Sequence, residues 1–343
     1  MNRTGVLKGL LESSDPSVRW RARVHVLDED RDSRRIRRLE DEIRSSPRSK
    51  SLLQSRERLT STHAGWAVYD KWRGIHWALL SLADIGYPRG EPALFPLRDR
   101  SYALWLGSHY FTEFESRSKA EAYRNRGRRG VPLVNGRYRR CASQQAGSLY
   151  ATTLLGLNNA RTPQLVERLL HWEWPDGGWN CDITPSADTS SFAETLLATR
   201  ALTEYGKQFR NSAATEAARK ASEVFLRRRL FRRVSNGRIM QPDFTKLHFP
   251  RYWHYDVLGG LTAMARLGRA KDPRCSEALD LLESLELPGG GWGAQAKYYS
   301  TVSRSTSTRM AERVHWGGTG RRLNPWVTTE ALAALRSSRR WDP

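Results

Sequence analysis

Apolar residues recur at intervals of three and four positions along most of this 343-residue chain, the spacing of helices with one buried face. No segment keeps the sustained alternation of apolar and polar residues that is typical of a half-buried strand. Helices are predicted at residues 72–86, 144–157, 163–170, 190–205, 213–230, 253–267, 276–285 and 325–335. The pattern therefore predicts an all-α protein of about five helical hairpins.

Three tryptophans lie in glycine-containing turns between predicted helices. Trp66, Trp179 and Trp292 are each 113 residues apart, in the strings Ala-Gly-Trp, Pro-Asp-Gly-Gly-Trp-Asn and Pro-Gly-Gly-Gly-Trp-Gly. A helix, a glycine-aromatic turn and a second helix that recur along a chain indicate a repeat architecture. We expect these three tryptophans to wedge neighbouring hairpins together.

The chain divides into two predicted parts. Residues 1–60 carry charged amphipathic segments, and one of them begins at Asp15-Pro16, a cap followed by proline in the first turn. We expect these helices to pack on a repeat domain that spans residues 61–343. Residues 88–140 are the least regular stretch and are expected to form an exposed insertion.

The charge and the cysteine content indicate which partners and which cellular compartment the chain fits. The net charge is +21, and only nine of the 57 basic residues are lysine. Such a chain can attract phosphate, nucleic acid or anionic head groups, although clustered arginines also serve as solvated surfaces. The arginines gather at residues 31–38, 124–129, 137–140, 227–233 and 336–340. Three widely spaced cysteines and no long apolar run favour a cytoplasmic protein with reduced thiols and no transmembrane segment.

Several strings resemble those of the terpenoid cyclase and protein prenyltransferase superfamily, especially bacterial prenyltransferase/squalene-cyclase repeat proteins. The resemblance covers roughly residues 60–340. It rests on Trp-Pro-Asp-Gly-Gly-Trp-Asn-Cys-Asp at 174–182, Ser-Ser-Phe-Ala-Glu-Thr-Leu at 190–196, Trp-His-Tyr-Asp-Val-Leu at 253–258 and Asn-Pro-Trp-Val-Thr at 324–328. It implies an α/α toroid, in which inner helices surround a central cavity and outer helices surround them.

Two catalytic motifs of that superfamily are missing from this chain. The Asp-x-Asp-Asp string that protonates squalene-type substrates does not occur, and neither does the Asp-Asp-x-x-Asp string that holds magnesium in class I cyclases. Polycyclisation started by protonation is therefore not supported. The resemblance therefore predicts the fold and its cavity better than it predicts a reaction.

The resemblance to prenyltransferases also implies a zinc site. Those enzymes hold zinc with an Asp-x-Cys pair and a histidine from a later inner helix. The corresponding candidates here are Cys181, Asp182, Asp188 and His254. Three of them would leave one coordination position open, the arrangement of catalytic zinc. The alternative is that Cys181 is a small buried apolar residue and that Asp182 caps a turn.

A site without metal is the other possibility. The toroid comparison implies inner-helix positions for His76, Glu194, His254, Asp256 and Glu330, where a histidine and a carboxylate in an apolar cavity could exchange protons. Each of them could equally be a structural hydrogen-bonding residue. The aromatic lining would consist of Trp72, Trp77, Tyr252, Trp253 and Trp326. Aromatic faces stabilise positive charge, as isoprenoid chemistry requires.

The sequence thus predicts an α/α-toroid protein that binds a hydrophobic, isoprenoid-like ligand in a central cavity, as a terpene cyclase-like or prenyltransferase-like enzyme or as a binding protein. Arginines at the cavity mouth would hold a diphosphate group. Two alternatives remain open: a helical repeat protein that binds nucleic acid through its basic surface, and a non-catalytic scaffold.

Overall fold

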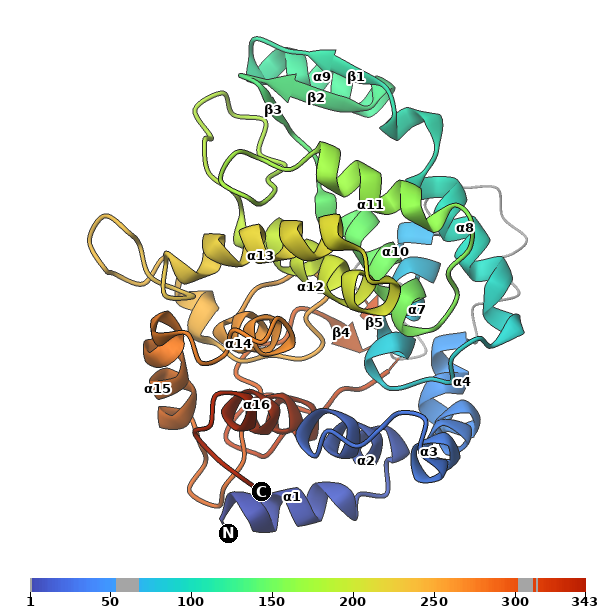
Figure 1. Cartoon of the computed structure of the whole chain (residues 1–343), viewed down its shortest axis with the longest axis vertical. Helices are drawn as coiled ribbons and strands as arrows, with labels where there is room; N and C mark the ends of the chain where they lie inside the picture. Colours follow the sequence, from blue (N-terminus) through green and yellow to red (C-terminus); the bar gives the residue numbers. More distant parts are fainter. Residues whose placement is uncertain (1, 54–67, 302–310, 313) are drawn as a thin grey trace. The chain divides into compact units, whose positions relative to one another are not determined.

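The computed structural model describes residues 2–53, 68–301, 311–312 and 314–343, most of which are helical (Figure 1). The chain forms two compact units. Unit 1 comprises residues 1–90 and 226–343, and unit 2 comprises residues 91–225. Trp66 lies outside the described residues, and so does the predicted domain boundary near residue 60, which stays a prediction.

Unit 1 joins the two ends of the chain. α2 begins at the predicted proline, and the Asp15 carboxylate accepts a hydrogen bond from Ser17 N at 2.9 Å. α16 contacts α1, α2 and α14, so the last helix packs between helices from both parts of the unit. The helices of this unit are α1 (Arg3–Leu11), α2 (Pro16–Arg21), the π-helical η1 (Ala22–Val26), α3 (Arg34–Ser45), α4 (Pro47–Leu53), α7 (Ile75–Asp84), η4 (Pro242–Thr245), α14 (Val257–Arg266), η5 (Pro273–Cys275), α15 (Ser276–Ser284) and α16 (Pro325–Ser337).

Unit 2 is centred on one helix pair. α10 and α12 make the most extensive helix contact in this unit, and α8 and α11 also pack on α10. The helices of unit 2 are η2 (Pro92–Leu94), α8 (Phe95–Trp105), η3 (Ser108–Tyr110), α9 (Lys119–Arg129), α10 (Ala142–Leu154), α11 (Thr162–His171), α12 (Phe192–Phe209) and α13 (Ser212–Leu226), which ends at the unit boundary.

Two small sheets accompany the helices. β1 (Glu113–Glu115) pairs in parallel with β2 (Val131–Val134), which pairs antiparallel with β3 (Arg137–Tyr138). β4 (Ser300–Thr301) pairs with β5 (Ala311–Glu312). Strands of two to four residues are too short to show alternation, and this is why the sequence pattern missed them. The stretch 88–140, expected to be irregular, holds helices α8 and α9 and the three-stranded sheet.

The glycine-tryptophan turns at Trp179 and Trp292 have the same hydrogen bonds. Each indole Nε1 donates to the carbonyl oxygen ten residues earlier, Trp179 to Leu169 at 2.8 Å and Trp292 to Leu282 at 2.7 Å. The turns themselves close through matching backbone pairs, from 174 to 178 and from 287 to 291. The protein is therefore all-α and built from helices joined at glycine-tryptophan turns, as the α/α-toroid class predicts.

Close packing explains the glycines in these turns. Gly177 has a φ of +95°, a backbone conformation that residues with a side chain rarely adopt. A Cβ atom on Gly178 would come within 2.6 Å of Thr195 Oγ1, so only glycine lets the turn approach α12. The glycines that mark this turn in the sequence are therefore the ones that its backbone conformation and its close approach to α12 require.

Most helices lie where the apolar spacing predicts them, but α14 begins at Val257, four residues later than expected. Asp256 caps it by accepting a hydrogen bond from Gly259 N, and the residues before it form a loop. Among the described residues, no helix combines the length and the apolar character needed to cross a membrane.

Candidate functional site

Unit 1 presents four of the predicted site residues on one loop, which ends at Asp256. Residues 247–256 precede α14 and carry Tyr252, Trp253 and His254 in succession. The start of the loop is fixed to Gln295, which accepts a hydrogen bond from Leu247 N at 2.9 Å and donates its own N–H to Leu247 O at 2.7 Å. The end of the loop is fixed by a buried network of charges.

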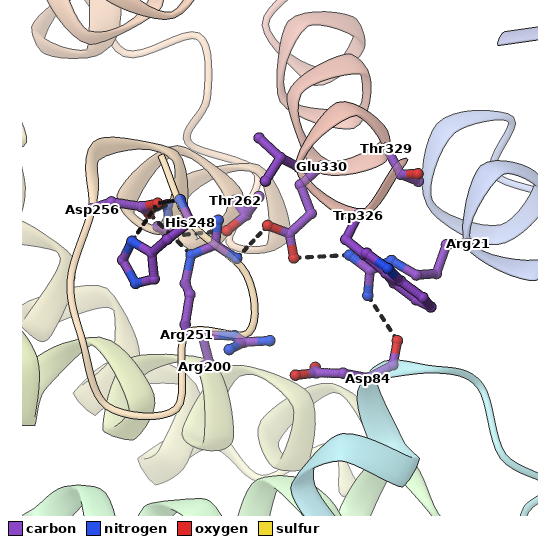
Figure 2. A network of polar contacts seen from close by, with 12 residues as sticks. Arg21, Asp84, Arg200, His248, Arg251, Asp256, Thr262, Trp326, Thr329 and Glu330 are labelled. Atoms are coloured by element: carbon purple, nitrogen blue, oxygen red, sulfur yellow. Dashed lines mark hydrogen bonds and ion pairs between the residues drawn. The ribbon is translucent and has the colours of Figure 1, made fainter. Parts of the chain in front are cut away.

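That network begins at Asp256, which has no exposed surface (Figure 2). One carboxylate oxygen accepts hydrogen bonds from Arg251 Nε at 3.0 Å and from Gly259 N at 2.6 Å, and the other from His248 N at 2.9 Å. Arg251 also pairs with Glu330 of α16. The loop is therefore attached to both α14 and α16.

Glu330 extends the network to the N-terminal helices. Its second carboxylate oxygen accepts a hydrogen bond from Arg21 of α2 at 2.8 Å, and Arg21 also donates to the carbonyl of Asp84 at the end of α7 at 2.7 Å (Figure 2). Arg21 and Glu330 are both buried. Charges taken out of water need such paired partners, so the network fixes the relative positions of α2, α7 and α16.

The network gives Asp256 a positioning role. Burial alone would raise the pKa of its carboxyl, but the Arg251 guanidinium, His248 and the Gly259 N–H hold that pKa well below its usual range. The carboxylate is thus ionised and fully engaged with its neighbours. The proton-transfer role predicted for Asp256 stays a prediction, and the geometry favours its use as an anchor of the loop.

The predicted aromatic residues come together beside this loop. Trp72 stacks on Tyr252 with ring centroids 4.0 Å apart and an interplanar angle of 7°. Its ring also lies 4.7 Å from that of Trp77 and 4.6 Å from that of Trp253. Trp72, Trp77 and Tyr252 are buried, whereas Trp253 is half-buried. Four of the five residues proposed as an aromatic lining therefore form one cluster.

The cluster continues to the solvent through a half-buried aromatic rim, formed by Tyr69, Trp253, His254 and Tyr298. The His254 ring stacks on Tyr298 at 4.0 Å and 12°, and on Trp253 at 5.1 Å and 27°. Tyr69 lies 5.0 Å from the buried Trp77, and Lys71 Nζ lies 4.1 Å from the centroid of the Trp253 ring. The rim joins aromatic faces to a histidine and a cation.

Both predicted histidines of this unit are neutral at pH 7. Burial lowers the pKa of His76 to about 3. Burial, and then the neighbouring His248, lower the pKa of His254 to about 4. His254 Nδ1 has no hydrogen-bond partner among the described residues. That nitrogen is itself buried, whereas the ring as a whole is half-buried and neutral. A neutral imidazole has one nitrogen that can accept a proton or a hydrogen bond.

Trp326, the fifth predicted aromatic residue, belongs to a second group. Its ring stacks on Phe249 at 5.2 Å and 12° and meets Trp316 edge-on at 5.1 Å. The Arg48 guanidinium lies 4.8 Å from its centroid. Phe249 comes from the same loop as Trp253, so this second group packs against the start of the loop.

The predicted zinc ligands are divided between the two units. His254 belongs to unit 1, whereas Cys181, Asp182 and Asp188 belong to unit 2. Asp188 is exposed, and the exposed Asp182 accepts a hydrogen bond from Thr184 N at 2.9 Å, which is the turn-capping alternative. The site therefore does not form within either unit, and the zinc set of the sequence stays a prediction.

Cys181 has other neighbours that the sequence did not suggest. Its Sγ donates to Glu194 Oε1 at 3.4 Å, and Cys141 Sγ completes a group whose three ligand atoms all lie within 4.8 Å of one another. Glu194, predicted as an acid-base residue, thus lies with two thiols.

Sequence reasoning missed several residues of these sites, among them Tyr69, Arg21, His248 and Arg251 of unit 1. Cys141 and Tyr298 show why. Cys141 lies between the stretch expected to be irregular and the helix predicted at 144–157, and Tyr298 follows the last glycine turn with no periodic signal around it. The Tyr-Tyr pair at 298–299 was the available hint for the aromatic rim.

Comparisons with known proteins leave the chemistry open. No protein-family profile matches this chain, and no curated protein does. Among solved structures, the chain is similar to the unsaturated glucuronyl hydrolase from Bacillus sp. GL1, which is responsible for the degradation of glycosaminoglycan. The identity is 12%, the alignment covers 95% of this chain and 85% of that one, and the TM-score is 0.44. A likeness of this degree assigns neither an activity nor a substrate.

Proposed function

We propose that unit 1 binds a hydrophobic, unsaturated small molecule of the isoprenoid type on the aromatic rim of Tyr69, Trp253, His254 and Tyr298. One observation carries the proposal: four aromatic residues singled out from the sequence meet in one cluster, and that cluster continues into half-buried rings. Aromatic side chains that reach the surface over a rigid, buried base present apolar area at little entropic cost.

The chemistry of the rim favours an unsaturated chain. Indole faces attract positive charge and polarisable groups, so they would hold an alkene and stabilise a cation that develops on it. With an allylic diphosphate, the C–O bond would break and diphosphate would leave with the bonding electrons, which creates the cation. His254 would then accept the proton lost from a carbon next to that cation, and the electrons of the broken C–H bond would form the new double bond. In this form the protein is an enzyme of the cyclase or transferase type; without that step it is a binding protein.

Binding is tested with farnesol and farnesyl diphosphate, titrated into the full-length protein and followed by tryptophan fluorescence and calorimetry. We expect saturable binding that weakens at least tenfold in Trp253→Leu and in the Tyr298→Leu variant. The matched control is Tyr123→Leu, which removes an aromatic ring that is 73% exposed in unit 2. Equal affinity in all three variants, or no binding to the wild type, would reject the proposal.

The arginine groove beside α3 supports a second candidate function. A depression of about 620 Å³ in unit 1 is lined by residues of α2, η1, α3 and the loop before α3, namely Arg19, Arg23, Glu29, Ser33, Arg34, Arg35, Arg38, Leu39 and Glu42. Five arginines thus face two glutamates. Arg19 pairs with Glu42 and Arg23 with Glu29, while Arg34 and Arg38 are exposed and lie one helical turn apart.

A groove of this charge fits the phosphates of a nucleic acid. A fluorescent single-stranded oligonucleotide titrated at increasing salt should lose affinity steeply, and Arg34→Glu with Arg38→Glu should abolish the remainder. Trp253→Leu should leave that binding unchanged. Affinity that does not respond to salt or to the double substitution would exclude this function.

A further inference from the structure

We propose that unit 2 contains a zinc site formed by Cys141, Cys181 and Glu194, with a fourth coordination position open to solvent. The site lies wholly in unit 2, so it is independent of the aromatic rim and of the arginine groove in unit 1.

Backbone pairing brings the two cysteines together. Arg139 and Asn180 form a parallel β-bridge, so the chain segments that lead to Cys141 and Cys181 run side by side. Cys141 is the N-cap residue of α10, and Cys181 follows the glycine-tryptophan turn. Forty residues separate the two cysteines in sequence, and this bridge is what aligns them.

Glu194, the proposed third ligand, is held in place by its neighbours. It lies in the first turn of α12, which packs along α10. One carboxylate oxygen accepts a hydrogen bond from Ser143 N at 2.9 Å, and the other accepts from Cys181 Sγ at 3.4 Å. The Ser143 contact directs the second oxygen toward the sulfurs.

The distances suit zinc. Zinc–sulfur bonds of about 2.3 Å and zinc–oxygen bonds of about 2.0–2.2 Å in a tetrahedron place two sulfurs about 3.8 Å apart, and sulfur about 3.5 Å from oxygen. The observed separations, 3.4 Å for Cys181 to Glu194 and at most 4.8 Å within the group, need only small side-chain rotations.

The donor set and its surroundings favour the same ion. Two thiolates and a carboxylate match the borderline softness of zinc better than that of magnesium or calcium. Cys141 and Glu194 both lie at helix N-termini, where the helix dipole stabilises negative charge. No fourth histidine, cysteine or acidic side chain of the described ranges joins the group, and the two thiols are half-buried. Three protein ligands with solvent access are the arrangement in which zinc activates a water or polarises an oxygen of a substrate.

The test is metal content of the full-length protein, purified under reducing conditions, supplied with zinc and dialysed. We expect one zinc per chain by mass spectrometry in the wild type and in the control Cys275→Ser, which removes the thiol in unit 1. Cys141→Ser and Cys181→Ser should keep less than a tenth of that zinc, and Glu194→Gln should bind it at least tenfold more weakly.

A second measurement uses cobalt in place of zinc and requires only the wild-type protein, so it does not depend on whether the variants fold. Cobalt(II) bound to the wild type should show a thiolate charge-transfer band in the near ultraviolet, with an intensity that corresponds to two sulfurs. A wild-type protein that takes up neither metal overturns the proposal. So does zinc content that is equal in all variants, or a cobalt complex that lacks the thiolate band.

Discussion

The Thr328 hydroxyl accepts a hydrogen bond from Trp292 N at 2.9 Å and donates one to Trp292 O at 3.0 Å, so one side chain holds both backbone groups of the turn tryptophan. Thr195 has the same relationship to Trp179 in unit 2, with distances of 3.2 and 3.4 Å. The loop between tryptophan and threonine differs in length in the two turns, yet the contact is the same. The glycine-tryptophan turn is thus fastened to the following helix by a threonine.

Removal of that hydroxyl should destabilise the fold. Thr328→Val leaves the buried N–H of Trp292 without a partner, whereas Trp292 O keeps its hydrogen bond from Asn324 N. An unpartnered buried group of this kind costs about 1–3 kcal/mol. We expect a lower thermal midpoint and urea midpoint than in the wild type. Thr328→Ser, which keeps the hydroxyl, is the control, and equal stability of the two variants would contradict the prediction.

A substitution in the buried charge network that anchors the loop at residues 247–256 should also destabilise the fold. Asp256→Asn removes the charge that compensates Arg251 and leaves a buried guanidinium with fewer partners, a change that typically costs about 3–5 kcal/mol. Urea unfolding measures the loss, and near-ultraviolet circular dichroism should show weaker aromatic signals because the loop carries Tyr252 and Trp253. Asp342→Asn, at an exposed position, should change neither.

Stability should fall in mild acid because of His76. Its pKa in the folded protein is about 3, below the value near 6.5 of an unfolded histidine. Protons therefore bind the unfolded chain first, and the stability present above pH 6.5 is lost as the pH falls toward 3.

The magnitude between pH 7 and pH 5 is about 2 kcal/mol for this one group, because each pH unit below 6.5 contributes about 1.4 kcal/mol. His76→Gln should lose correspondingly less stability over the same interval in urea unfolding. A pH dependence identical to that of the wild type would show that His76 is not the group responsible. His254, whose pKa is also lowered, adds a change of the same sign.

The three cysteines should differ in reactivity. Burial, and then the charge of Asp272, raise the pKa of the Cys275 thiol to about 12, and its side chain has no exposed surface. Iodoacetamide at pH 8 should therefore modify Cys275 only after unfolding, because the thiolate is the reactive form. Peptide mass mapping with and without urea measures this, and rapid modification of the folded protein would contradict it.

The amino-acid sequence by itself determined the local structure of this protein. The helices, the cap at Asp15 and the turns at Trp179 and Trp292 were predictable because their hydrogen bonds and apolar spacing involve residues close together in the chain. Trp72 and Trp253 were predicted as ligand-lining residues from a resemblance and not from spacing. The structure places them in one cluster, and their role in binding stays a prediction.

The tertiary structure alone decided which charged and reactive groups meet. Arg21 pairs with Glu330 across 309 positions, and Cys141 reaches Cys181 and Glu194 because a two-residue bridge and the packing of α10 on α12 align them. No periodicity encodes such contacts, since they depend on how whole elements pack after their apolar faces are buried. The loop before α14 shows the same limit: Asp256 caps the helix through local partners, but the Arg251 that it holds pairs with Glu330 of α16, 79 positions away, and no local pattern contains that contact.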